Sequence, residues 1–308
     1  MSAAASETCA NSNEPVMPPT VGAVVLTQGK RPAELAAAVK SILDQHGVTL
    51  DLVIVGNGWD PVELVGGLPD RVKSHALPEN LGIPAGRNAG VPLVNGEYLL
   101  FLDDDALLAS SDFLAVSIGL LESNPAIGLI QPQVIDQSGA PNPRRWIPRI
   151  KKGSPSHSSA VFSVWEGALV ARRSVFDQVG GWGDEYFYAH EGIELAWRFW
   201  DAGAIVWYAG DLIANHPAID PRRHDDYYRL NARNRVWLAR RNLPAALIPL
   251  YVGSWTAIQI VRSRRDASAR AAWFAGWREG WSEDPGARRA ISWRTVATMT
   301  RFGRPPII

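Results

Sequence analysis

Segments with the character of strands and helices alternate through roughly the first 130 residues of this chain. Val21–Thr27 and Leu50–Val55 are short apolar runs rich in β-branched residues, as buried strands are. Between them, Pro32 begins a segment whose apolar residues recur at helical spacing until Gly47. Alternation of this kind is typical of βαβ units, in which helices cover both faces of a mostly parallel sheet. The chain is therefore predicted to adopt an α/β, Rossmann-like fold.

Acidic residues follow the last of the predicted strands in this region. A third short strand is predicted over Arg71–Ala76, and the glycines of Asn80–Gly90 predict a tight loop that enters a helix. Glu97–Leu102 is then an apolar strand followed directly by Asp103, Asp104 and Asp105. In open α/β sheets ligands bind beyond the carboxyl ends of the strands. The three aspartates are thus candidates for a binding site.

Three adjacent carboxylates repel one another, and a bound divalent cation relieves that repulsion. Hard oxygen ligands suit Mg²⁺ or Mn²⁺, and a metal at this position could bridge a diphosphate. An aspartate-rich turn or helix cap is the alternative interpretation. The apolar strand that precedes the triplet favours the cation site.

Five motifs in order resemble those of a family 2 glycosyltransferase with the GT-A fold, over residues 21–242. They are Val24–Thr27, Val53–Gly58, Asn80–Gly82 with Ala85–Gly90, Leu102–Asp105, and Trp165–Ala168 with His190–Arg198. More narrowly, the whole pattern resembles the galactofuranosyltransferases that initiate the cell-wall galactan of mycobacteria and use UDP-galactofuranose. The resemblance implies a Mn²⁺- or Mg²⁺-dependent enzyme with a UDP-sugar donor and a polyprenyl-diphosphate-linked rhamnosyl-N-acetylglucosamine acceptor.

The resemblance also assigns donor-side residues. By it, Thr27 and Asn57 line the uridine pocket, Arg87 meets uracil or phosphate, Asp103 and Asp104 face the nucleotide, and Asp105 and His216 ligate the metal. Many relatives carry an aspartate where this chain has Gly56. Recognition of uracil is therefore expected to come from other groups.

On the acceptor side, the resemblance places Trp165 and Glu166 against the acceptor and makes Glu191 the catalytic base. A base is needed because a sugar hydroxyl is a poor nucleophile until its proton is removed. Gly192 stands where relatives carry a second acid, so the register of the base is open. The assignment of the base remains between Glu191 and Glu194.

Glu191 precedes a helix predicted over Ile193–Ala202. Glu194, three residues on, is expected on the same helical face, where it could serve as the base or pair with Arg198 as an ordinary ion pair. His190 could position the acceptor or share the proton, although a lone histidine is more often structural.

The last third, Asp225–Ile308, is predicted to be helical and carries a strong positive charge. Residues 221–308 contain 17 arginines, no lysine and 6 acidic residues, although the whole chain has a net charge of zero. Asn242–Val261 contains no charge, but its polar residues and prolines favour insertion into a membrane surface over crossing. Tryptophans recur every four residues at Trp273, Trp277 and Trp281. They predict an interfacial membrane helix, with packing against the catalytic domain as the alternative.

These features predict a flexible tail over residues 1–20, a GT-A catalytic domain over 21–224 and a membrane-associated region over 225–308. A peripheral position on the cytoplasmic face of the cell membrane is expected, with no nucleic acid as a partner. The single Cys9 and the absence of a signal peptide agree with a reducing compartment. The expected function is inverting, metal-dependent galactofuranosyl transfer. Another family 2 transferase, such as a rhamnosyltransferase, and a non-catalytic nucleotide-binding scaffold remain as alternatives.

Overall fold

The computed structural model describes residues 17–62, 72–139, 141–149, 153–218 and 226–307. Most of the tail predicted over 1–20, including Cys9, lies outside these residues. At the centre of the described part of the chain is a sheet of nine strands, in the order β3-β2-β1-β4-β8-β6-β9-β5, with β7 paired to β9. The strands are β1 (Thr20–Thr27), β2 (Thr49–Asn57), β3 (Val72–Leu77), β4 (Tyr98–Asp103), β5 (Leu107–Leu108), β6 (Ile127–Ile135), β7 (Ser159–Ala160), β8 (Ala168–Arg172) and β9 (Ile205–Asn215).

The first four strands run parallel to one another, and β1 lies between β2 and β4. Strand β1 is an almost continuous apolar run because helices cover both faces of the sheet, so both sets of its side chains are buried. In register, Thr27 pairs with Gly56 and Leu26 with Asp103. The carboxyl ends of three strands therefore meet at one edge. The predicted mostly parallel α/β fold is confirmed.

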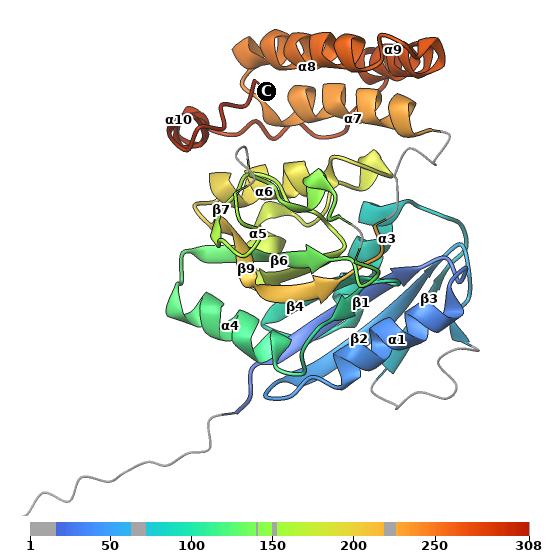
Figure 1. Ribbon diagram of the computed structural model, residues 1–308, viewed down its shortest axis with the longest axis vertical. Coiled ribbons are helices and arrows are strands. Elements are labelled where there is room, and N and C mark those ends of the chain that lie inside the picture. The colour runs from blue at the N-terminus through green and yellow to red at the C-terminus, as the bar shows by residue number, and fades with distance from the viewer. Residues whose placement is uncertain (1–16, 63–71, 140, 150–152, 219–225, 308) are drawn as a thin grey trace, which may run out of the picture.

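Helices flank the sheet on both sides (Figure 1). They are α1 (Pro32–Leu43), α3 (Ile83–Gly90), α4 (Phe113–Ser123), α5 (Arg173–Val179), α6 (Glu191–Asp201), α7 (Tyr227–Asn242), α8 (Ile248–Arg262), α9 (Ala267–Ser282) and α10 (Trp293–Arg301), with short 3₁₀ turns at Val91–Leu93, Arg144–Trp146, Asp184–Tyr186 and Ala245–Leu247. Helices α1 and α4 bury their apolar residues against one face of the sheet, and α5 and α6 against the other. Proline in the first turn begins α1, as expected.

Helix α3 packs so closely on the sheet that glycine is required along one of its faces. A Cβ atom on Gly86 would lie 2.5 Å from the Leu26 side chain, and one on Gly90 would lie 2.6 Å from the Val24 side chain. Both distances are shorter than real carbon contacts allow. The glycines that predicted a tight loop and helix thus set how near Arg87, on the same helix, comes to the end of β4.

The C-terminal helices form a further layer, which covers α6 on the side away from the sheet (Figure 1). A third apolar cluster joins the two layers and includes Tyr186 and Trp197 below, with Trp237, Tyr251 and Met299 from the C-terminal helices. Gly276 and Gly280 let α9 lie directly on α7, because a Cβ atom at either position would collide with an α7 residue. The predicted helical C-terminal region is confirmed.

The three tryptophans of α9 do not form one exposed face. Trp273 is 5% exposed, Trp277 packs against the third apolar cluster, and Trp281 is 40% exposed. The prediction of a uniform membrane-facing stripe is therefore wrong for Trp273, because the close packing of α9 on α7 covers it. No helix in the described part of the chain is both long and apolar enough to cross a membrane.

Candidate active site

The carboxyl ends of β1, β2 and β4 line a cavity of about 690 Å³, here called the first cavity. Thr27, Asn57 and Asp103 reach it together because their strands are parallel neighbours. The buried Asn57 amide donates to the Asn80 side chain at 2.8 Å and to the Gly82 carbonyl at 3.0 Å. These bonds tie the end of β2 to the loop before α3. The structure thus brings the residues expected around uridine to one cavity.

Gly56 has no space for the aspartate that many relatives carry. A Cβ atom at this position would lie 1.9 Å from the backbone oxygen of Trp59, because the chain turns back immediately after β2. The departure from the family pattern therefore has a local steric cause. Recognition of uracil has to use other groups that line the first cavity.

A second cavity, of about 660 Å³, adjoins the first and shares five lining residues with it. The shared residues are Arg31, Ile83, Asp103, Tyr188 and Tyr227. All of the residues predicted for the metal, the base and the acceptor line it, namely Asp105, Trp165, Glu166, His190, Glu191 and His216, and so does Asp103, which was predicted to face the nucleotide. The structure therefore brings those two groups of residues together beside the first cavity.

The three adjacent aspartates face in two directions. Asp104 accepts a hydrogen bond from the Thr27 hydroxyl at 2.6 Å and pairs with Arg31 at 2.7 Å. Burial raises the pKa of the Asp104 carboxyl. Asp103 and Asp105 instead face His216, whose Nε2 lies 4.0 Å from the first carboxylate and 3.1 Å from the second. Two of the three carboxylates, rather than all three, are therefore placed for a cation. Asp103 joins the predicted ligands Asp105 and His216.

The chemistry of His216 fits a divalent cation. Its Nδ1 lies 2.7 Å from the backbone oxygen of Pro217, which can only accept, so Nδ1 carries the hydrogen. Burial lowers the pKa of His216 and favours the neutral ring, which leaves a lone pair on Nε2. That lone pair faces carboxylate oxygens of Asp103 and Asp105. The nitrogen and the oxygens repel one another unless a cation lies between them. Ligand atoms of Asp103, Asp105 and His216 lie within 4.8 Å of one another, and two oxygens with one imidazole suit Mn²⁺.

Arg87 holds Asp103 in place. Its guanidinium pairs with Asp103 at 2.6 Å and lies 5.0 Å from the Trp182 ring centre. The side chain is buried and lines the second cavity, not the first, so contact with uracil does not fit its position. Its Nη1 has no hydrogen-bond partner among the described residues. Contact with a phosphate remains a prediction for this residue.

Glu191 begins α6 and lines the second cavity, two residues earlier than the predicted start of the helix. Burial raises the pKa of its carboxyl to about 8, and the nearby Glu166 carboxylate adds to the shift. Burial also raises the pKa of Glu166. Glu166 accepts a hydrogen bond from the Gly192 backbone at 3.0 Å, and a Cβ atom on Gly192 would lie 2.2 Å from it. Glu166 thus occupies the space beside Glu191 that a second acid on the helix would need.

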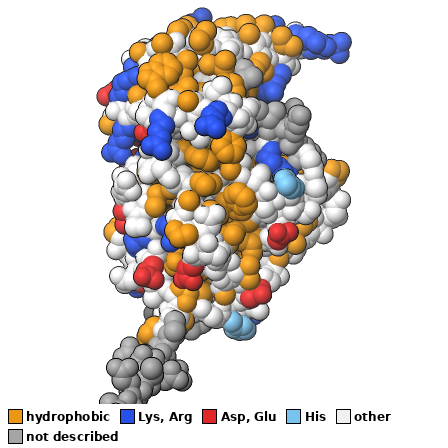
Figure 2. Space-filling view, turned by 90° about the vertical axis from the view of Figure 1, so that its left-hand side faces the viewer, with side chains coloured by type: hydrophobic (Ala, Val, Ile, Leu, Met, Phe, Trp, Pro, Cys, Tyr) orange, Lys and Arg blue, Asp and Glu red, His pale blue; other side chains and the backbone are white. Residues whose placement is uncertain are grey.

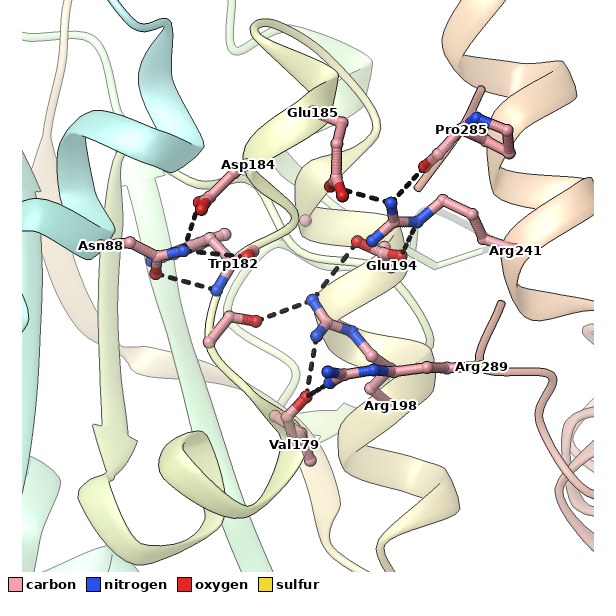
Figure 3. Close-up of polar contacts among 12 residues, drawn as sticks. Asn88, Val179, Trp182, Asp184, Glu185, Glu194, Arg198, Arg241, Pro285 and Arg289 are labelled. Atoms are coloured by element: carbon pink, nitrogen blue, oxygen red, sulfur yellow. Dashed lines mark hydrogen bonds and ion pairs between the residues drawn. The ribbon is translucent and has the colours of Figure 1, made fainter. Parts of the chain in front are cut away.

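Glu194 does not share the surroundings of Glu191. It is buried between Arg198 at 3.3 Å and Arg241 of α7 at 2.8 Å, as Figure 3 shows, and it does not line the second cavity. An interval of three residues leaves the two side chains only about 60° apart around the helix. The expected shared surroundings are nevertheless not found, because the buried Arg198 and Arg241 guanidinium groups hold the Glu194 carboxylate outside the second cavity. The ion pair with Arg198 is confirmed, and Glu191 remains as the base candidate.

A strained segment leads into Glu191. Phe187, Ala189 and His190 have positive φ angles of 63°, 69° and 77°, which cost energy for residues other than glycine. Asn234 of α7 holds this segment, since its buried amide donates to the backbone oxygens of Tyr186, Tyr188 and Ala189 at 2.9, 2.6 and 2.9 Å. No pattern in the sequence indicated this role, because Asn234 lies inside a helix far along the chain.

His190 is buried in the wall of the second cavity. Burial holds the pKa of its imidazole well below the ordinary value, so the ring is neutral. Neither ring nitrogen has a hydrogen-bond partner among the described residues. The ring can therefore donate to or accept from an acceptor hydroxyl, and its role in positioning the acceptor stays a prediction.

Trp165 packs against the candidate metal ligand His216, with the ring centres 4.8 Å apart, and against Trp146 at 5.9 Å. It therefore fixes the imidazole and also presents an aromatic wall to the second cavity. Arg31, which pairs with Asp104 and also contacts Asp105, was not identified from the sequence. Its position four residues after Thr27 at a strand end is the signal that could have suggested it.

Comparison with known proteins decides the family. Residues 23–180 match the model of a protein family, which is described as Glycosyl transferase family 2. The chain belongs to this family. A curated relative, the pre-mycofactocin glycosyltransferase of Mycobacterium tuberculosis, is 26% identical over 159 residues, which are 45% of this chain and 31% of that protein. The chain therefore spans less than a third of the length of the curated relative it matches.

Solved structures of glycosyltransferases share the GT-A fold of this family member. S. aureus TarS in complex with UDP has a TM-score of 0.54 and 15% identity, covering 80% of this chain and 73% of TarS. GalNAc-T7 with UDP, GalNAc and Mn²⁺ has a TM-score of 0.62 and 13% identity, and the match covers 93% of this chain and 58% of the GalNAc-T7 chain. Mannosyltransferase PcManGT from Pyrobaculum calidifontis, in complex with GDP-Man and Mn²⁺, has a TM-score of 0.56 and 16% identity, covering 94% and 81%. At these identities the likeness shows the fold.

Proposed function

We propose that this family 2 glycosyltransferase is an inverting, metal-dependent galactofuranosyltransferase. It would move galactofuranose from UDP-galactofuranose to a polyprenyl-diphosphate-linked rhamnosyl-N-acetylglucosamine. One observation carries the catalytic part: the base candidate Glu191 and the metal set of Asp103, Asp105 and His216 line one cavity, which adjoins the first cavity. The choice of sugar and acceptor rests on the resemblance of the sequence motifs.

The donor side supports a nucleotide diphosphate sugar. The UDP in the TarS and GalNAc-T7 structures and the Mn²⁺ in the latter support UDP and Mn²⁺ as ligands of this chain. Thr27 and Asn57 would orient the nucleoside in the first cavity. A cation held by Asp103, Asp105 and His216 would neutralise charge on the departing diphosphate. Arg87 keeps Asp103 aimed at that position.

On the acceptor side, Glu191 takes the proton from the acceptor hydroxyl as its oxygen bonds to the anomeric carbon. The bond from that carbon to the diphosphate oxygen breaks in the same displacement, so the anomeric centre inverts. The raised pKa of Glu191 suits this role, because a base with a pKa near the working pH transfers protons best. Trp165 and His190 would hold the acceptor sugar against Glu191.

We also propose that the C-terminal layer rests on the cytoplasmic face of the cell membrane. Leu250 and Val261 of α8 are 55% and 62% exposed, and Trp281 of α9 is 40% exposed. Figure 2 shows apolar side chains over the top of this layer and Lys and Arg side chains around it. Exposed apolar groups with surrounding arginines are the composition of a surface that binds anionic lipid.

Release of UDP tests the proposed activity. With UDP-galactofuranose, Mn²⁺ and a rhamnosyl-N-acetylglucosaminyl lipid diphosphate analogue, we expect acceptor-dependent release of UDP, which EDTA abolishes. Asp105→Ala should lower kcat by at least about 10²-fold, because charge on the leaving group increases in the transition state. UDP-galactopyranose, followed by release of UDP, and dTDP-rhamnose, followed by release of dTDP, serve as donor controls. Equal turnover with either control donor, or normal turnover of Asp105→Ala in EDTA, would contradict the proposal.

A further inference from the structure

The second cavity extends beyond the metal and the base into a region lined by arginines from the C-terminal layer. Arg235 lies on α7, Arg262 ends α8, and Arg304 follows α10, and all three line the cavity. The indole of Trp255 lies among them, 3.8 Å from the Arg235 guanidinium and 5.9 Å from that of Arg262. Helices of the C-terminal layer therefore bring positive charge to the second cavity.

These three arginines lack compensating negative charge. In the described part of the chain, no carboxylate forms an ion pair with Arg235, Arg262 or Arg304, whereas Arg229 and Arg241 of α7 do have such partners. Burial lowers the pKa of Arg235 and of Arg304, and positive neighbours lower each further. The buried Nε of Arg235 has no hydrogen-bond partner among the described residues. An anion bound beside these guanidinium groups would offset the positive charge that Arg262 places near Arg235 and that Arg144 places near Arg304.

Beyond the arginines lies an apolar slot of about 160 Å³. This third cavity shares Ser163, Ile193, Arg235, Trp255 and Arg304 with the second cavity, and its other walls include Phe162, Trp197, Met299 and Pro306. A water molecule occupies about 30 Å³ in the liquid. The slot therefore has room for the first few carbons of a chain, and the remainder would leave over the surface.

The order of these features matches the order of groups in one kind of molecule. From the nucleotide outward come the metal and base, then the arginines, and then the apolar slot. We propose that Arg235, Arg262 and Arg304 bind the diphosphate of the lipid-linked acceptor and that the third cavity takes the first part of its hydrocarbon chain. This inference rests on the proposed function for the nature of the acceptor, and it adds the residues that recognise the acceptor away from its sugar.

Calorimetric titration of the full chain, with Mn²⁺ and UDP bound so that the metal position is filled, tests this subsite. The probes are farnesyl diphosphate, farnesol and inorganic diphosphate. We expect farnesyl diphosphate to bind more tightly than either of the others. Arg262→Gln and Arg304→Gln should each weaken binding of farnesyl diphosphate and of inorganic diphosphate about tenfold, since each removes a charged hydrogen-bond donor, and should leave farnesol unchanged.

Arg265→Gln is the matched control, because Arg265 is exposed three residues beyond Arg262 and does not line the cavity. Equal losses in Arg265→Gln would show general charge attraction and would overturn the proposal. Loss of vesicle binding by Arg262→Gln with unchanged farnesyl diphosphate affinity would assign the arginines to lipid headgroups and would overturn it as well. Thermal melts establish that each variant is folded. The binding test does not depend on transfer of a sugar. If the chain binds farnesyl diphosphate but has no activity on UDP-galactofuranose, that result contradicts the proposed function and leaves the diphosphate subsite standing.

Discussion

Glu191 and Glu194 stand three residues apart on one helix, yet their side chains have different charged neighbours. Glu191 lies beside another carboxylate in a cavity, and burial raises its pKa to about 8. Glu194 lies between the guanidinium groups of Arg198 and Arg241 and pairs with both (Figure 3). A proton acceptor has to gain and lose its proton near the working pH, and of the two only Glu191 is placed to do so.

Glutamine substitutions separate these two roles. Glu191→Gln should lower kcat about 10²–10⁴-fold and leave the affinity for UDP unchanged, because a positioned base acts in the transition state. Glu194→Gln should instead reduce the free energy of unfolding by about 3 kcal/mol, because it leaves Arg198 and Arg241 partly uncompensated in a buried place. Steady-state kinetics and chemical denaturation measure the two effects. Exchange of these outcomes would move the base to Glu194.

The raised pKa of Glu191 also predicts a dependence on pH. Between its unfolded pKa of 4.5 and about 8, the native state holds a proton that the unfolded state has lost. The free energy of unfolding should therefore fall as pH rises through this window, by at most about 1.4 kcal/mol per pH unit, while kcat/KM rises toward pH 8. In Glu191→Gln, the fall in the free energy of unfolding that comes from Glu191 should be absent from this pH window. A wild-type stability that increases across the same window would contradict the raised pKa.

The sequence predicted which residues gather at the site better than it predicted how each side chain is used. Thr27, Asn57 and the aspartates were placed correctly because strand ends follow from hydrophobic patterning and parallel strands align those ends. The division of the aspartates was not foreseen, since it depends on where Arg31 and His216 lie. Contacts between residues 73 or more positions apart, as in the Arg31–Asp104 pair, have no local signal.

At the scale of elements, α7 is part of the catalytic machinery as well as of the C-terminal layer. Asn234 holds three backbone oxygens of the strained segment before Glu191, and Arg241 holds Glu194 on the next turn of α6. Both contacts cross the boundary predicted near residue 225. The helical character of this third was predictable from its periodicity, whereas its contacts with α6 depend on side chains that only the packed structure brings together.

Asn234→Asp tests this support, because it keeps the shape of the side chain and removes the N–H donors. We expect kcat to fall by up to about 10²-fold, since a small displacement of a positioned group is enough for such a loss. Asn124→Asp, at the end of α4 and far from both cavities, is the control and should keep wild-type kcat. The pH profile of kcat/KM should also shift in Asn234→Asp, because the segment that positions Glu191 moves, and simple destabilisation does not change this readout. Wild-type kcat and pH profile in this variant would refute the positioning role.

At the scale of the whole molecule, the membrane proposal joins two forces that respond differently to salt. Arginines near an anionic surface contribute about 1 kcal/mol each and are screened by salt, whereas inserted apolar groups are not. We expect the chain to co-sediment with anionic vesicles and to be released only partly at high salt. Replacing Leu250, Val261 and Trp281 with serine should make that release complete. Trp273 is unsuitable for this test because it is buried.

Failure of the wild-type chain to bind anionic vesicles at low salt would remove the membrane proposal. The exposed apolar residues of α8 would then need another partner. The sequence showed that arginines are concentrated in residues 221–308. It did not show that several of these arginines donate hydrogen bonds to backbone oxygens inside the protein. Arg240 donates to the Gly280 oxygen at 2.6 Å, and Arg288 donates to the Leu243 oxygen at 2.6 Å. These side chains join the helices of the layer to one another.

The two ends of the molecule differ in their basic side chains. The helical layer has arginines and no lysine, whereas the sheet layer has exposed lysines. Residues 221–308 contain no lysine, while Lys40 on α1 and Lys73 on β3 have side chains that are 73% and 43% exposed. Helix α1 and strand β3 lie at the opposite end of the molecule from α8 and α9 (Figure 1). Amine-reactive coupling through Lys40 or Lys73 therefore attaches the protein to a sensor surface by its sheet end, which leaves the helical layer pointing outward to meet vesicles in solution.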